Sequence, residues 1–344
     1  MAGIKIILSY KRKAKSYQNG IITPIQTGRA IADEIFAGML GDDTGENISK
    51  DNDRYNELSA QYWVWKNYEE IGNPDYVGFM HYRRHFVFKS DLDYIDKDPW
   101  FPGMPIYKVP YFSKEFQENI SEDNINKVVC EGYDCYVIKP YDVRYFDTDD
   151  LYMKEHYIST IPGAKRYIWN AFFDVIKELH PEYSEILKEF SYGSRLNACN
   201  MFIMKKELFF EYSVFCFDIL KELDKRIDSR RFTKQEQRFL GYLAEYLLTM
   251  YVMKIQKERK KIKYLDALLF LNMQEEPRIK KVFSKILTVE NQKYHKAYKF
   301  LGIFKLRIRR KNSIYDHLQE QDYRLKVLTD KVTELQEQII LNNR

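Results

Sequence analysis

Residues 81–85, His-Tyr-Arg-Arg-His, place five side chains that could bind a ligand in one short stretch of the sequence. They directly follow the apolar run 76–80, which predicts a buried strand. In open α/β sheets, ligands bind beyond the carboxyl ends of the strands. Two guanidinium groups at such an end favour an anionic ligand, and a phosphate-bearing substrate fits best. The alternative is that Arg83 and Arg84 pair with surface carboxylates and that one histidine is a core residue.

Paired carboxylates form a second kind of candidate. Asp42 and Asp43 stand between two glycines, where they could face a ribose, a sugar or a cation, or form a solvated turn. The pattern Asp-x-Asp, which can hold a divalent cation, occurs at 91–93 and at 147–149. Neither run immediately follows an apolar strand, so the spacing only weakly favours a metal site.

A predicted helix over 232–253 carries Arg238, Gly241 and Glu245 at i, i+3 and i+7. This spacing puts the three residues on one side of the helix. The arginine and the glutamate are either a structural pair or the charged end of a cleft.

Another helix is predicted over 56–67, where an aromatic stripe recurs with helical spacing. Such a stripe more often packs in a core than binds a ligand, and this holds for Trp65. Glu57, beside Asn56 and one turn before Gln61, is the better candidate for a polar contact.

Strands and helices alternate along the chain, which predicts an α/β fold. Further strands are expected at 4–9, 133–139 and 197–204, and further helices at 113–130, 167–179 and 207–227. The stretch 89–111 is rich in Asp, Pro and Tyr, and a long loop of this kind is expected to be a lid or an acceptor-binding segment.

Length and composition agree with a folded protein. The 344 residues are 45% apolar, enough for one large α/β domain with an appendage or for two domains. The net charge of +5 is concentrated towards the C-terminus, so nucleic acid is not implied as a partner. Four cysteines without CxxC spacing indicate reduced thiols in a cytoplasmic protein. No run of 18 uncharged apolar residues occurs, so any membrane contact is expected to be peripheral.

The C-terminal region differs in character. Residues 256–312 are expected to form a basic amphipathic helical segment, in which 291–312 holds eight Lys or Arg and no Asp or Glu. Such a segment suits an anionic membrane surface, and the alternative is a solvated basic surface. From 313 to 344, apolar residues recur as a heptad, which predicts a coiled coil and hence a homo-oligomer or docking to a partner.

Five blocks of the sequence, taken in order, resemble the DUF4422 family of bacterial glycosyltransferases, which occur in capsule and O-antigen gene clusters. The blocks are Pro24–Gly28, Gly41–Ser49, Asn56–Asn67, Gly78–Arg84 and Asn200–Met204. The resemblance covers about residues 3–255 and not the heptad region. One departure is visible, because Glu245-Tyr246-Leu247 stands where a family pattern ending in Glu-Arg-Leu is expected.

The resemblance implies a GT-A-like, Rossmann-type mixed sheet flanked by helices, which uses a nucleotide sugar that is expected to be UDP-linked. It implies three groups of site residues. The candidate catalytic carboxylates are Glu245, Asp42 and Asp43. The candidate donor-binding residues are Thr27, Gly28, Asn47, Lys66, Asn67, His81, Tyr82, Arg83, Arg84 and Asn200. The candidates for acceptor binding or another role are Asn56, Glu57, Trp65, His156 and Arg238.

The function expected from this resemblance is transfer of a sugar, with galactofuranose one candidate, to a lipid-linked saccharide in polysaccharide synthesis. No feature indicates a covalent nucleophile, so an inverting single displacement is expected. A divalent metal, Mg or Mn, or the arginines would stabilise the leaving diphosphate. The expected location is the cytoplasmic face of the membrane. The alternative is a non-catalytic scaffold that binds a nucleotide sugar, whereas a phosphate-transferring enzyme is disfavoured because GxxxxGK[ST] is absent.

Overall fold

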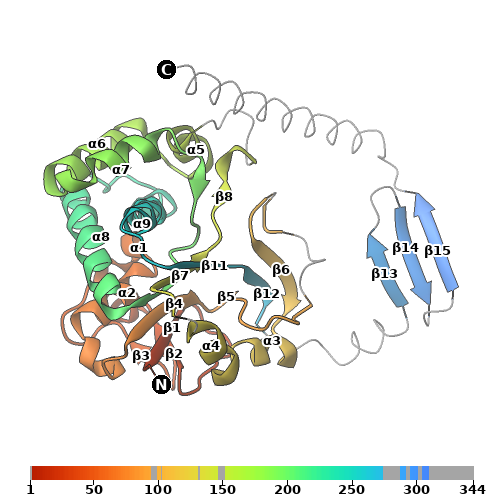
Figure 1. Cartoon of the computed structure of the whole chain (residues 1–344). Coiled ribbons are helices and arrows are strands. Elements are labelled where there is room, and N and C mark those ends of the chain that lie inside the picture. Colours follow the sequence, from red (N-terminus) through yellow and green to blue (C-terminus); the bar gives the residue numbers. More distant parts are fainter. Residues whose placement is uncertain are drawn as a thin grey trace. The chain divides into compact units, whose positions relative to one another are not determined.

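The computed structural model describes residues 2–93, 99–101, 103–130, 132–145, 152–273, 287–291, 295–300 and 304–309 (Figure 1). The chain forms two compact units, Met1–Glu275 and Glu276–Arg344. Each unit is described separately below.

A ten-stranded mixed sheet is the centre of the first unit. Its main path runs in the order β11-β7-β10-β4-β1-β2-β3, and β5, β6 and β12 extend it on another branch. Strands β1 to β4 are mutually parallel along this path, whereas β10 runs antiparallel to both of its neighbours. The strands are β1 (Ile4–Tyr10), β2 (Ile22–Gln26), β3 (Leu40–Gly41), β4 (Tyr76–His81), β5 (Arg84–Phe86), β6 (Ile106–Tyr111), β7 (Cys135–Ile138), β10 (Phe202–Lys205), β11 (Ile262–Leu265) and β12 (Ala267–Asn272). A separate two-stranded sheet pairs β8 (Tyr141–Asp142) with β9 (Arg195–Leu196).

Strand β4 lies between β1 and β10, and its sequence explains this central place. Tyr76 to Met80 are all buried, as expected for a strand covered on both faces. Gly78 lets β10 approach closely, because a Cβ at this position would lie 2.7 Å from Ile203 Cγ1. The close packing brings the residues that precede β10 next to His81, the last residue of β4.

Most of the helices pack together beside the sheet. Helices α6, α7, α8 and α9 form one group in Figure 1, and α3 and α4 lie apart from it. The α-helices are α1 (Asn52–Tyr55), α2 (Leu58–Lys66), α3 (Lys114–Asn119), α4 (Glu122–Val129), α5 (Met153–Thr160), α6 (Arg166–Leu179), α7 (Ser184–Ser191), α8 (Lys206–Arg226) and α9 (Phe239–Lys257). The 3-10 helices are η1 (Arg29–Ile31), η2 (Ser49–Asp51), η3 (Tyr68–Ile71), η4 (Val143–Tyr145), η5 (Pro181–Tyr183) and η6 (Glu236–Arg238).

The expected α/β fold with a mixed sheet flanked by helices is confirmed, with local corrections. The helix expected over 232–253 begins only at Phe239, so Arg238 lies in the 3-10 helix η6 and not on α9, and the strand expected at 197–204 begins only at Phe202. The single helix expected over 113–130 is two helices, because Ser121 caps the start of α4 by accepting a hydrogen bond from the Asn124 backbone. The stretch 89–111, expected to be irregular, contains the strand β6. Pro110 is compatible with this strand because β6 pairs with β12 and lies at an edge among the described residues.

The C-terminal boundary of the first unit also differs from the expectation. The sequence predicts a domain that ends at 255, followed by a helical segment over 256–312. Instead, β11 and β12 complete the main sheet, and the first unit ends at Glu275. Residues 287–309 contain three antiparallel strands: β13 (Leu287–Asn291), β14 (His295–Phe300) and β15 (Phe304–Arg309). The physical reason is visible in 304–309, where apolar and basic residues alternate with the period of a strand and not of a helix.

Two further expectations concern parts that the structure does not describe. The predicted coiled coil over 313–344 and the Asp-x-Asp run at 147–149 lie outside the described residues. Among the helices that are described, none has the length and apolar character needed to span a membrane.

Candidate functional site

Eight residues from four separate segments of the sequence meet beyond the carboxyl end of β4, and we call them the central cluster. They are Asn56, Glu57, His81, Arg84, Cys199, Asn200, Arg238 and Glu245. Seven of the eight, all except Cys199, are among the site residues expected from the sequence.

His81 is held by contacts at both ring nitrogens. Its Nε2 lies 2.8 Å from the Cys199 carbonyl oxygen, and its Nδ1 lies 3.4 Å from Arg84 Nη1. Because a carbonyl accepts and a guanidinium donates, this arrangement fits a neutral ring protonated at Nε2. Burial is the main cause that lowers the His81 pKa, and the charge of Glu57 opposes this effect. His81 is therefore neutral at physiological pH.

Asn200 joins the start of α2 to the start of α9. Its Nδ2 donates to Glu57 Oε1 at 2.9 Å and to the Gly241 carbonyl oxygen at 3.0 Å. The backbone carbonyl oxygen of Asn200 accepts a hydrogen bond from Gln61 Nε2 at 3.0 Å. The side chain is completely buried, so these bonds are protected from water.

Glu245 has the most strongly shifted carboxyl group of the cluster. Burial raises its pKa to about 7, and the negative charge of Glu57 adds to this effect. A hydrogen bond from the Cys199 backbone and the charges of Arg84 and Arg238 act in the opposite direction. A carboxyl group with a pKa near the working pH can both accept and donate a proton, which is the property needed for general acid–base chemistry.

Two cations complete the cluster. Arg238 donates from Nε to Asn56 Oδ1 at 2.9 Å. The guanidinium of Arg84 lies 4.4 Å from the centre of the Trp100 ring, and its Nε has no hydrogen-bond partner among the described residues. No ion pair within the described part of the chain joins either Arg83 or Arg84 to a carboxylate. Arg84 is therefore available to an anionic ligand.

The other residues of the 81–85 stretch have different surroundings. Tyr82 stacks on Tyr10 with ring centres 5.5 Å apart, and Arg83 is exposed with its guanidinium 5.5 Å from the Tyr82 ring. His85 is completely buried against Phe112 and Phe270, and burial lowers its pKa to about 3. His85 is therefore the core histidine of the alternative interpretation of this stretch.

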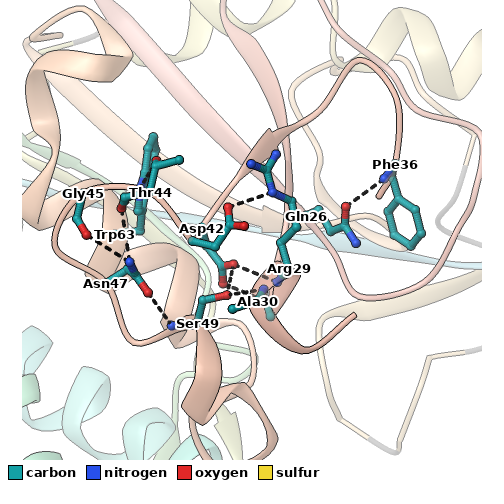
Figure 2. A network of polar contacts seen from close by, with 12 residues as sticks. Gln26, Arg29, Ala30, Phe36, Asp42, Thr44, Gly45, Asn47, Ser49 and Trp63 are labelled. Atoms are coloured by element: carbon teal, nitrogen blue, oxygen red, sulfur yellow. Dashed lines mark hydrogen bonds and ion pairs between the residues drawn. The ribbon is translucent and has the colours of Figure 1, made fainter. Parts of the chain in front are cut away.

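Asp42 lies in a hydrogen-bonded network with Arg29 and Ser49 (Figure 2). The side chain is completely buried, and its two oxygens accept from four donors. These donors are the Gly28 and Arg29 backbone N–H groups at 2.7 and 3.0 Å and the Ser49 and Ser59 hydroxyls at 2.5 and 2.6 Å. A carboxylate that is fully occupied in this way is a structural anchor, so the expectation that Asp42 is a catalytic base is not supported by its surroundings.

Asp43, Thr27 and Gly28 belong to the same region. Asp43 forms an ion pair with Arg29 at 2.7 Å, and the Thr27 hydroxyl donates to the Tyr10 carbonyl oxygen at 3.3 Å. Gly28 adopts a φ of 64°, which places its N–H against Asp42. The network reaches the central cluster through Ser59, whose hydroxyl lies 3.0 Å from the Asn56 carbonyl oxygen.

Four expected residues lie at the opposite end of α2. The nine residues of this helix span about 13 Å, which separates Trp65, Lys66 and Asn67 from Glu57. Lys66 lies 3.9 Å above the Trp65 ring and 3.5 Å from Glu46, and Asn67 donates to the Glu46 carbonyl oxygen. Asn47 bonds within its own loop to Thr44 and Gly45. The structure does not bring these four residues to the central cluster.

His156 is also separate from the cluster. It is 2% exposed, and its Nδ1 lies 2.8 Å from the Tyr246 hydroxyl. Tyr141 approaches the other ring nitrogen at 3.4 Å. Burial lowers the His156 pKa to about 4, so this residue is a neutral core histidine and is not placed to bind an acceptor.

Comparison with known proteins places the chain in a family. A family model described as a domain of unknown function, DUF4422, matches residues 5–258. The chain belongs to the DUF4422 family. All eight residues of the central cluster lie within the matched region. Comparison with curated proteins finds no match.

One solved structure, the WbbM bifunctional glycosyltransferase in its apo form, is similar to this DUF4422 protein. The two chains are 33% identical with a TM-score of 0.71. The match covers 78% of this chain and 46% of the WbbM chain, so this chain spans a little under half the length of that protein.

Three residues around the DUF4422 cluster were not expected from the sequence. Cys199 contributes backbone groups, Trp100 packs on Arg84, and Gln61 holds the Asn200 backbone. A signal existed for two of them, since Cys199 precedes Asn200 and Trp100 lies in the stretch 89–111 expected to be functional. No signal in the sequence relates Gln61 to Asn200, because 139 positions separate them.

The described part of the chain has no group of three or more His, Cys, Asp and Glu side chains arranged to hold a metal ion. Asp91 and Asp93 are both exposed, and Asp91 lies 3.9 Å from Lys89. A metal-binding role for this run stays a prediction.

Proposed function

We propose that this DUF4422 protein is a glycosyltransferase that moves a sugar from a nucleotide-sugar donor to a saccharide acceptor in polysaccharide synthesis. The observation that carries the proposal is the position of Glu245, whose pKa is raised to about 7 by burial, beside Arg84, Arg238 and neutral His81. The similarity to a protein described as a bifunctional glycosyltransferase supports it.

In this proposal, Glu245 takes the proton from the attacking acceptor hydroxyl. A base is needed there because the hydroxyl becomes more acidic only as it bonds to the sugar carbon. Arg84 stabilises the negative charge that develops on the leaving diphosphate. Arg83, which is exposed beside Tyr82, is a secondary candidate for the same role. The transfer is a single displacement and inverts the configuration of the sugar.

The finer features of the proposal extend the expectations from the sequence. The donor is UDP-linked, galactofuranose is one candidate sugar, and the acceptor is a lipid-linked saccharide. A divalent cation, Mg or Mn, is an alternative to the arginines as the group that stabilises the diphosphate. The protein acts at the cytoplasmic face of the membrane, where the basic region 291–312 contacts anionic lipid and the heptads of 313–344 form a homo-oligomer.

The test is a nucleoside-diphosphate release assay over a panel of nucleotide sugars, with a lipid-linked acceptor extract and with or without EDTA. Wild-type protein should release nucleoside diphosphate from one donor, and Glu245→Gln should reduce the rate by about 10²-fold or more. Glu70→Gln, at an exposed position in η3, is the matched control and should retain full activity. Arg84→Ala should reduce the rate more than Arg83→Ala.

Each alternative has its own result in this assay. Binding of a nucleotide sugar without any release would favour the non-catalytic scaffold. Release that EDTA abolishes would assign the diphosphate to a metal and not to Arg84. Full activity of Glu245→Gln would remove the proposed base.

A further inference from the structure

Residues 30–38, between β2 and β3, form an exposed segment that we call the apolar tip. Every residue of this segment except Phe36 is exposed, and five of the exposed residues are isoleucine or alanine. Ile35 is 67% exposed and Ile31 is 42% exposed. Single apolar side chains are common on protein surfaces, but several of them in one segment often mark a contact with a partner or a membrane.

A buried side chain holds the apolar tip in place. Gln26 is buried at the end of β2, and its Nε2 donates to the Glu34 carbonyl oxygen at 2.7 Å. Its Oε1 accepts from the Phe36 backbone N–H at 2.8 Å (Figure 2). The two bonds lie on either side of Ile35 in the sequence, so a fixed backbone presents this side chain to solvent. Because the tip is already ordered, a contact made by Ile35 loses little conformational entropy.

Residues 11–16, which follow β1, lie beside the apolar tip, and we call them the basic loop. Lys13 forms an ion pair with Glu34, which joins the two segments. Arg12 is exposed and has no carboxylate partner within the described part of the chain. The two carboxylates of the tip, Asp33 and Glu34, are outnumbered by the four exposed cations of the loop, which are Lys11, Arg12, Lys13 and Lys15.

Both segments lie at the edge of the sheet where the central cluster lies. Strand β1 pairs in parallel with β2 and with β4, and in this register Ser9 is opposite both Ile25 and His81. The basic loop and the apolar tip follow the carboxyl ends of β1 and β2, and the central cluster lies beyond the carboxyl end of β4. A partner bound to these two segments would therefore be at the same edge as the cluster.

We propose that the apolar tip and the basic loop together form a contact surface for an anionic lipid bilayer. Ile31 and Ile35 enter the headgroup region, and Arg12 and the neighbouring lysines lie at the level of the lipid phosphates. The combination suits a bilayer, because burial of apolar area and attraction to anionic lipid add to each other. A protein partner is disfavoured, since a stable interface buries about 800 Å² on each side, more than two isoleucines and three alanines offer.

This surface belongs to the first unit, whereas the lipid contact considered above belongs to residues 291–312. Contact at the sheet edge would bring the saccharide of a lipid-linked acceptor towards the central cluster. That consequence rests on the proposed function, but the contact with lipid does not.

The test is co-sedimentation of the full chain with vesicles made of equal parts of phosphatidylcholine and phosphatidylglycerol. Ile35→Ser and Arg12→Gln should each lower the partition coefficient about fivefold, the first by loss of apolar area and the second by loss of one cation. Ile35→Leu keeps the apolar area and should bind as wild type does.

The matched controls are Leu179→Ser and Arg166→Gln, which lose the same kinds of group at exposed positions of α6. This helix lies away from β1 and β2 in Figure 1. Both controls should leave the partition coefficient unchanged. At high ionic strength, or with vesicles of phosphatidylcholine alone, the effect of Arg12→Gln should disappear and that of Ile35→Ser should persist.

Amide hydrogen exchange of wild-type protein locates the contact directly. Vesicles should slow the exchange of residues 11–16 and 30–38 and leave that of α6 unchanged. Protection of other residues only, with these two segments unprotected, would place the contact elsewhere and overturn the proposal.

Equal vesicle binding by wild type, Ile35→Ser and Arg12→Gln would also overturn it, as would no binding by wild type. A mass that increases with protein concentration without vesicles, and that Ile35→Ser reduces, would make the tip an interface between copies of the chain instead. The vesicle assay is independent of the transferase assay. A protein that showed the expected lipid contact but released no nucleoside diphosphate would retain this surface and lose the proposed function.

Discussion

At the scale of single residues, the protonation of the cluster follows from a balance between burial and neighbouring charge. His81 and Glu245 are both pushed towards their neutral forms by burial. The charge of Arg84 lowers the pKa of both residues. This favours the neutral form of His81 but the ionised form of Glu245. Because burial dominates for Glu245, this carboxyl group stays protonated to a much higher pH than an exposed glutamate would.

This shift predicts a change of stability with pH. Between pH 4.5 and about 7 the folded state holds a proton on Glu245 that the unfolded state has released, so stability falls as pH rises through this window. The effect amounts to at most about 3 kcal/mol. Glu245→Gln removes this effect. The difference between the free energy of unfolding of the variant and that of wild type, measured in urea, should therefore increase in favour of the variant from pH 4.5 to pH 8. Glu70→Gln should show no such trend. An equal difference from wild type at both pH values would contradict the raised pKa.

At the scale of elements, the cluster depends on how the start of α2 is anchored. Asp42 holds Ser59 in the first turn of α2, and Ser59 in turn contacts the Asn56 carbonyl oxygen. On the other side, the start of α9 approaches so closely that a Cβ at Gly241 would lie 2.4 Å from Asn56 Nδ2. The junction between α1 and α2 is therefore held between the buried carboxylate of Asp42 and Gly241 of α9, which has no side chain at the contact.

The anchor predicts different effects for two neighbouring substitutions. Asp42→Asn replaces an acceptor by an amide whose N–H groups face four donors, and should lower the free energy of unfolding by about 3 kcal/mol. Asp43→Asn loses a partly exposed ion pair with Arg29 and should lower it by less than about 1 kcal/mol. Urea unfolding of both variants measures the difference. A small effect at Asp42 would mean that its network does not anchor α2.

At the scale of the whole chain, the residues after 255 contribute to the site although they lie far from it in sequence. Strand β12 pairs with β5, and in this register Leu269 is opposite Arg84. Strand β11 extends the sheet beside β7. The expected domain end at 255 would therefore remove two strands of the main sheet and expose the edge of the strand that carries Arg84.

Two truncations test this boundary. A chain ending at 275 keeps all ten strands of the sheet and should unfold cooperatively in urea, as expected for a complete unit. A chain ending at 255 loses β11 and β12 and should be poorly folded, with reduced near-ultraviolet circular dichroism. Equal stability of the two chains would show that the sheet does not need these strands.

The sequence by itself determined the features that depend on local pattern. The apolar run that forms β4, the position of His81 at its end, and the helical spacing of Gly241 and Glu245 all follow from periodicity, because the period of a segment is a property of neighbouring residues. The resemblance to a family predicted seven residues of the central cluster as site residues. It also predicted Asp42 and Lys66, which have the same kinds of charged group but lie outside the cluster.

Only the tertiary structure decided which of these groups meet. Glu57 and Asn200 are 143 positions apart, and no local rule relates them. The burial that raises the Glu245 pKa and the donors that occupy Asp42 arise from packing between distant segments. Likewise, only the tertiary structure shows that β12 pairs with β5, the strand of Arg84. A short apolar run in the sequence does not indicate which strand it pairs with.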